Sequence, residues 1–130
     1  MAVTSFTGPV ESAAGFTVGG VPTTGTVASQ LTASGAIASG SRVVELNHAS
    51  TPIAATMGQG PQGFFAIVNT SASGTAAHTV TLTTGSWNGT NKVATTNAPA
   101  ESCLVYFDSA GRGTLIYNGL TSGTNVVFSG

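Results

Sequence analysis

The fold class is decided by residues 78–83, which read HTVTLT. In an extended chain successive side chains point to opposite faces, so Val80 and Leu82 share one face and the three threonines share the other. We therefore expect one face to pack against a core, while the other meets water or a neighbouring chain. This pattern predicts a half-buried β-strand.

Similar short runs, rich in β-branched and aromatic residues, recur along the chain and are separated by clusters of Gly, Asn, Ser and Pro. Residues 64–68 (FFAIV) and 104–107 (LVYF) are apolar on both faces, which predicts central strands enclosed between two layers. We expect strands near residues 42–47, 53–57, 63–69, 78–84, 92–95, 102–107, 114–117 and 125–128. This spacing predicts an all-β fold, an antiparallel β-sandwich or flattened barrel of about 7–8 short strands, with Greek-key and meander orders both open.

Two turns are expected between these strands. Residues 87–90 (WNGT) and 108–113 (DSAGRG) contain the Asn-Gly and Gly-rich sequences that supply the positive φ of tight reversals. The second turn should join adjacent antiparallel strands. Trp87 is then the aromatic ring expected to be exposed, whereas Tyr106 and Tyr117 lie in apolar runs and are expected in the core.

Residues 1–40 consist almost wholly of Gly, Ala, Ser, Thr and Val, and prolines interrupt any continuous element. We expect an extended N-terminal arm over residues 1–40, followed by a β domain over residues 41–130. A disordered tail is the alternative, but the arm is more apolar than such tails usually are, which favours ordering against a partner or sister subunit. The expected partner-binding residues are the apolar anchors of this arm, Phe6, Pro9, Phe16, Val18 and Val21.

Charge is scarce throughout the chain. It has three basic and four acidic residues, 5% of the total, where an average soluble domain has about 25%. Such a surface suggests incorporation into an assembly, although hydroxyl and amide groups could also solvate it. Three cations are too few for the roughly six to ten phosphate contacts of duplex binding, so no nucleic-acid partner is expected.

Neither export nor membrane insertion is expected. The N-terminus lacks the basic start and apolar core of a secretory signal, and no apolar run approaches the roughly twenty residues of a membrane span. We therefore expect synthesis in the cytoplasm and no membrane partner.

No catalytic, cofactor or metal site is expected. His48 and His78 have no further ligand at metal-binding spacing, and no Gly-x-Ser-x-Gly or Walker-type motif occurs. Glu45 and Glu101 could supply a glycosidase pair, but nothing distinguishes them, and alternation places Glu45 on an outer face. Cys103 lies in an apolar run and is expected to be buried. The chain is therefore not expected to be an enzyme.

The order and style of the strands carry a resemblance. Residues 43–47 (VVELN), 53–57 (IAATM), 104–108 (LVYFD) and 115–119 (LIYNG) follow a Gly/Ser/Thr/Val-rich arm. In this the chain resembles the small virion proteins of tailed bacteriophages and cyanophages that decorate or cement the capsid. The resemblance implies a homotrimer on the capsid surface, attached to the major capsid protein through its arm. The alternative is a receptor- or glycan-binding module of a phage fibre or spike, using loops around Trp87 and residues 118–119.

Overall fold

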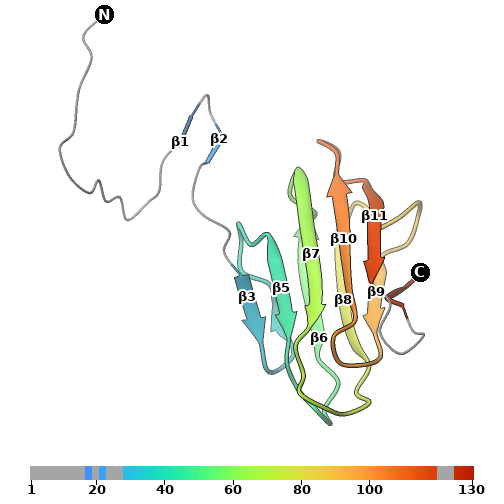
Figure 1. The fold of residues 1–130 in the computed structure, drawn as a ribbon. Coiled ribbons are helices and arrows are strands. Elements are labelled where there is room, and N and C mark those ends of the chain that lie inside the picture. Colours follow the sequence, from blue (N-terminus) through green and yellow to red (C-terminus); the bar gives the residue numbers. More distant parts are fainter. Residues whose placement is uncertain (1–16, 19–20, 23–27, 120–124) are drawn as a thin grey trace, which may run out of the picture.

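A computed structural model of the chain describes residues 17–18, 21–22, 28–119 and 125–130. These residues form twelve β-strands and no helix. Ten strands make two five-stranded sheets that pack as a sandwich, and β1 (Thr17–Val18) and β2 (Val21–Pro22) pair in a separate two-stranded sheet (Figure 1). The expected all-β sandwich is confirmed.

The two large sheets contain five strands each. The first sheet contains, from edge to edge, β11 (Gly113–Gly119), β10 (Ser102–Phe107), β7 (Gly63–Asn69), β5 (Val43–Leu46) and β3 (Ala28–Leu31). The second sheet contains β12 (Val127–Ser129), β9 (Val93–Thr96), β8 (His78–Thr84), β6 (Ala54–Gln59) and β4 (Gly35–Ala36). Both sheets keep open edges, so the sandwich does not close into a barrel.

From β3 to β8 the chain changes sheet at every strand, and we call this stretch, residues 28–84, the parallel coil. Strands that return to the same sheet after one turn run parallel to their predecessor, as β3, β5 and β7 do in the first sheet. Parallel neighbours need a crossover connection, and here a strand of the opposite sheet provides it. Of the remaining strands, β9 and β10 pair antiparallel with β8 and β7, and β12 and β11 pair antiparallel with β9 and β10.

The expectation of a purely antiparallel sandwich is therefore wrong in one respect. Each large sheet has two parallel and two antiparallel pairings. The observed order is neither a Greek key nor a meander. Side-chain alternation has the same period in both kinds of sheet, so it carries no information on strand direction.

The β domain begins earlier than expected. Residues 28–31 and 35–36 fall within the stretch expected to be an arm, yet they form edge strands β3 and β4. Leu31 packs against the core, and Ile37 is part of it. The boundary therefore lies by Ala28 instead of near residue 41, because a Gly- and Ser-rich segment can pair as a short edge strand when a neighbour supplies the ladder.

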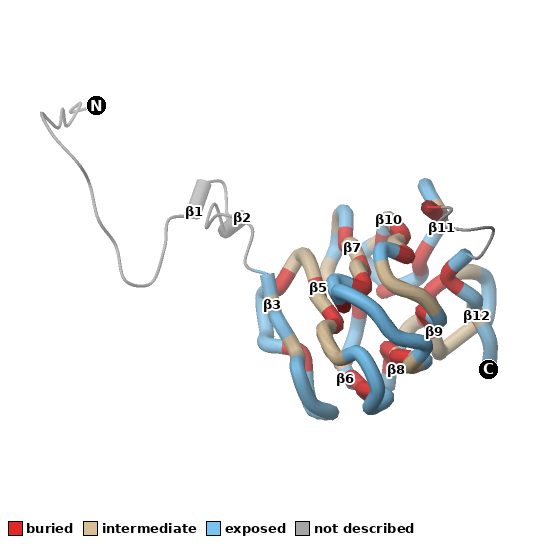
Figure 2. Tube along the Cα trace, turned by 60° about the horizontal axis from the view of Figure 1, so that its bottom comes forward, coloured by how far each residue is buried: buried red, intermediate tan, exposed pale blue. Residues whose placement is uncertain are grey.

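All eight expected strands are present, and β7, β8 and β10 have the predicted bounds. In β8 the burial alternates as predicted, with Val80 and Leu82 inside and Thr81 partly exposed. Figure 2 shows the same alternation of buried and exposed positions along the strands. Glu45 lies on the outer face of the first sheet, as expected, while its neighbours Val44 and Leu46 are buried.

Three aromatic rings fill one end of the core. Trp87 packs against Phe65 and Phe107 with ring centroids 5.9 and 5.4 Å away, and its indole N–H donates to the Val80 carbonyl at 3.0 Å. Gly60 lies so close that a Cβ there would approach the Phe107 ring to 2.4 Å. Burying such a ring stabilises the fold by about 2–3 kcal/mol before entropy costs.

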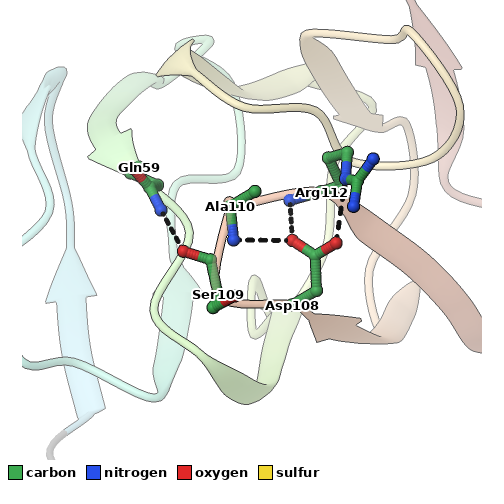
Figure 3. A network of polar contacts seen from close by, with 5 residues as sticks. All are labelled: Gln59, Asp108, Ser109, Ala110 and Arg112. Atoms are coloured by element: carbon green, nitrogen blue, oxygen red, sulfur yellow. Dashed lines mark hydrogen bonds and ion pairs between the residues drawn. The ribbon is translucent and has the colours of Figure 1, made fainter.

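The turn between β10 and β11 follows Phe107 directly, and Figure 3 shows its polar contacts. Asp108 Oδ1 accepts hydrogen bonds from the backbone N–H groups of Ala110 and Arg112, both at 2.9 Å, and Oδ2 accepts from Arg112 Nε. These bonds, the backbone bond from Arg112 foremost, lower the pKa of Asp108. Gly111 has φ of 74°. The predicted tight turn between antiparallel strands is confirmed.

Candidate functional site

The outer face of the first sheet carries exposed aromatic side chains. Phe64 on β7 is 56% exposed, Tyr106 on β10 is 40% exposed and Tyr117 on β11 is 59% exposed. Ile116, 54% exposed, stands beside Tyr117 where β11 bulges against β10. We call the outer surface of β11, β10, β7, β5 and β3 the aromatic face.

The strand register arranges the aromatic face in three rows that run across the strands. The first row contains Phe64, Tyr106 and Thr114, and the second contains Ala28, Val43, Ala66, Leu104 and Tyr117. The third row contains Gln30, Glu45, Val68, Ser102 and Gly119. Large rings thus dominate the first row, whereas the third row holds smaller or polar side chains.

Phe64 and Tyr106 make an edge-to-face contact, with centroids 5.4 Å apart and planes at 71°. Beside this pair lies a shallow hollow of about 280 Å³ lined by Arg42, Val43, Phe64, Ala66 and Leu104. Monomeric proteins rarely leave such a contiguous apolar patch open, and such patches often mark interaction sites. The aromatic face is therefore the candidate functional surface.

Two charged side chains flank this surface on the β5 side. Arg42 Nη1 donates to the Gln62 carbonyl at 2.7 Å, which holds the guanidinium near Gly63 and thus at the Phe64 end. Glu45 lies in the third row, at the opposite end, and accepts a hydrogen bond from Gln30 Nε2 at 3.3 Å. Positive and negative charge therefore lie at opposite ends of one face.

The expected exposure of the aromatic residues is wrong. Trp87 is buried, whereas Tyr106 and Tyr117 are exposed. In β7 and β10 one face is buried and the other is open, so these strands are not enclosed on both sides as expected. Because both faces are apolar, alternation alone could not tell the inner face from the outer one.

Two residues of the loops expected to bind a ligand in the fibre or spike alternative are committed within the fold. Trp87 fills the core, and Asn118 exchanges two hydrogen bonds with the backbone of Val126 at 2.9 and 3.0 Å. Neither group is free to contact a sugar ring. No observation on the described residues favours this alternative.

A serine and a histidine lie in contact at the other end of the sandwich, but their hydrogen bonds support the fold and do not form a catalytic pair. Ile53 N–H donates to His78 Nδ1 at 3.1 Å, so the proton of a neutral ring lies on Nε2, which is 3.3 Å from Ser71 Oγ. Ser71 Oγ donates to the His48 carbonyl at 3.1 Å and accepts from the His48 N–H at 3.0 Å. His78 therefore donates to the serine and cannot act as its base.

Glu45 and Glu101 do not form a catalytic pair. Glu45 is on the outer face, whereas Glu101 is fully buried, with Oε2 accepting a hydrogen bond from Asn97 N–H at 2.6 Å. Nearby, Asn69 bonds Thr96 Oγ1 at 3.3 Å. Among the residues that the structure describes, no group of three or more His, Cys, Asp or Glu could hold a metal ion.

Lowering the pH should destabilise the fold through His78. Burial is the main cause that lowers the pKa of His78 below its usual value of about 6.5. As the pH falls, the unfolded chain therefore binds a proton at this histidine before the folded protein does. His78 should not affect the free energy of unfolding above about pH 6.5. At lower pH the free energy of unfolding should decrease, by at most about 1.4 kcal/mol per pH unit.

Urea unfolding at about pH 7.5 and about pH 5.5 measures this effect. The matched control is His78→Gln, which cannot titrate but leaves His48 in place. A wild-type loss no larger than that of the variant would contradict a role for His78.

Cys103 should not react with thiol reagents in the folded protein. Burial raises the pKa of its thiol to about 12, so the reactive thiolate is almost absent near neutral pH. We expect no release of colour from 5,5′-dithiobis(2-nitrobenzoate) in native buffer and complete reaction in urea. Fast native labelling would show that the strand opens to solvent.

The structure describes only two of the five partner-binding residues expected in the arm. Phe6, Pro9 and Phe16 lie outside the described residues. Val18 and Val21 lie opposite each other in the ladder of β1 and β2. A role in partner binding stays a prediction for all five.

Comparison with protein-family models, curated proteins and solved structures finds no match to the chain. The structure contains no helix that is long and apolar enough to cross a membrane in the part of the chain that it describes.

Proposed function

We propose that this chain is a virion structural protein that decorates or cements the capsid of a tailed phage. The observation that carries the proposal is an open aromatic face on a molecule that has almost no charged residues. Lone soluble domains usually keep mixed charge on their surface and avoid large apolar patches. A protein whose surface is covered by neighbouring subunits does not need mixed surface charge and does not need to avoid apolar patches.

Attachment is assigned to the N-terminal segment, with the major capsid protein as partner. Apolar residues at intervals, Phe6, Pro9, Phe16, Val18 and Val21, suit a segment that adds to a sheet edge while its side chains enter pockets. Each aromatic ring buried on docking contributes on the order of 2 kcal/mol before ordering costs. Several linked copies would multiply this through avidity. The role is mechanical and requires no cofactor.

Deleting residues 1–25 should abolish attachment while leaving the β domain folded. β3 begins at Ala28, so both large sheets remain complete in this variant. We expect an unchanged far-UV circular dichroism spectrum and at least a tenfold loss of copies on purified particles, since the anchors are gone. Quantitative mass spectrometry of the particles measures occupancy.

The full-length chain bearing Phe6→Ala and Phe16→Ala is the matched control, because it keeps the segment and removes two rings. It should lose part of the occupancy. Undiminished occupancy of the deletion variant would refute attachment through this segment. A low-resolution map of the particle with this protein confined to the tail would refute decoration itself.

A further inference from the structure

We infer that the aromatic face is the interface of a two-fold homodimer, in which a second copy of this chain packs its own aromatic face against it. The two first sheets would stack about 10 Å apart, as sheets in sandwiches do. This inference goes beyond the proposed function. It also replaces the three-fold arrangement that the resemblance implies.

The row pattern is complementary to itself. A two-fold axis that runs across the strands along the second row exchanges the two outer rows. The bulky row of one copy, with Phe64 and Tyr106, then lies over the row of the other copy that contains Val68, Ser102 and Gly119. Large side chains meet small ones at both ends, which is what close packing of two corrugated sheets requires.

The charges obey the same symmetry. The axis brings Arg42 of one copy over Glu45 of the other, and the reverse contact follows because an isologous interface makes every contact twice. One hydrogen bond already holds each group in place: Arg42 donates to the Gln62 carbonyl, and Glu45 accepts from Gln30. Both retain further donor or acceptor positions for an intermolecular ion pair.

The size of the face also suits a dimer. Five strands spaced about 4.8 Å apart and about six residues long cover roughly 500 Å² in projection. Projecting side chains raise the accessible area above this value, toward the roughly 800 Å² that each partner buries in a standard interface. No charged side chain lies between the two flanking ones in the rows described above, so the centre can be desolvated without an unpaired ion.

The axis passes through the second row, so Leu104 meets its own copy across it. Leu104→Glu would place two carboxylates together at the centre. In sedimentation equilibrium of the full chain at micromolar concentrations, we expect the wild type to be a dimer and this variant to associate at least a hundredfold more weakly. Val127→Glu is the control, because Val127 is similarly open on the outer face of the second sheet. It should leave the dimer intact.

Charge exchange tests the orientation and does not depend on the central substitution. Arg42→Glu and Glu45→Arg should each weaken the dimer at least tenfold by placing like charges together, and the double variant should recover it. The two single variants, mixed, should form a heterodimer, because every contact between them joins opposite charges. Circular dichroism verifies that each variant is folded.

A wild-type monomer at about 100 μM, a trimer, or a failure of the double variant to recover would overturn the inference. These outcomes are separate from the fate of the proposed function. A monomer that still occupies the capsid would refute the dimer alone, and a dimer that never joins particles would refute decoration alone.

Discussion

Replacing Trp87 with alanine should lower the free energy of unfolding by about 3–5 kcal/mol, which is the range for removing a large aromatic side chain from a core. The ring is fully buried against Phe65 and Phe107, and both are held in β-strands that cannot move far to fill the space. The Val80 carbonyl would also lose the indole N–H that it accepts. This loss is a large fraction of the roughly 5–15 kcal/mol that stabilises a typical native protein.

Urea unfolding followed by circular dichroism measures the change, because the variant loses the main fluorophore. Val127→Ala is the control, since its side chain lies open on the second sheet, and it should change stability by no more than about 0.5 kcal/mol. A Trp87→Ala loss below about 1 kcal/mol would mean that the ring does not fill the core as described.

The second large effect is expected at Gly85, which follows β8. Its φ is 82°, and a Cβ there would approach the carbonyl oxygen of Gly111 to 2.1 Å. The backbone at Gly85 and at Gly111 cannot separate easily, because Ser86 N–H donates a hydrogen bond to the same Gly111 carbonyl. Gly85→Ala should therefore destabilise the protein by about 3 kcal/mol, from strain and steric overlap together.

Two other glycines separate these causes. Gly89 has φ of 65° but open space around it, so alanine there should cost only the conformational strain of about 1 kcal/mol. Gly58 has neither a strained φ nor a close neighbour, so Gly58→Ala should leave stability unchanged or slightly raised. Equal effects at all three positions would contradict the described loop geometry.

Local sequence patterns were sufficient to place the eight strands β5 to β12. Alternation in residues 78–83 and Gly-containing turns such as 108–113 report on the chain within a few residues, and these elements are where they were expected. Strand direction and partner choice depend on contacts between distant segments, which alternation does not encode. The parallel coil was therefore not foreseen, and the pairing of residues 28–31 as an edge strand was missed.

The candidate surface was missed for a related reason. Phe64 and Phe65 are adjacent and identical, yet one lies open to solvent and the other is in the core. Only the pairing of β7 with β5 and β10, and the packing of the second sheet on one side, decide between them. Trp87 was misplaced because a turn sequence indicates where the backbone reverses and gives no direction for the ring.

The parallel coil has a consequence for how the protein is made. Each turn of the coil offers an edge in both sheets to the turn that follows, so pairing can proceed in the order in which the ribosome delivers the chain. Strands β9 and β10 then add to β8 and β7, which are already in place, and β12 and β11 add to β9 and β10. Within the coil neither sheet can grow without the other, because consecutive strands from β3 to β8 belong to different sheets. We therefore expect that a chain released from the ribosome before β9 retains the coil in order but leaves both of its growing edges unpaired and prone to aggregation.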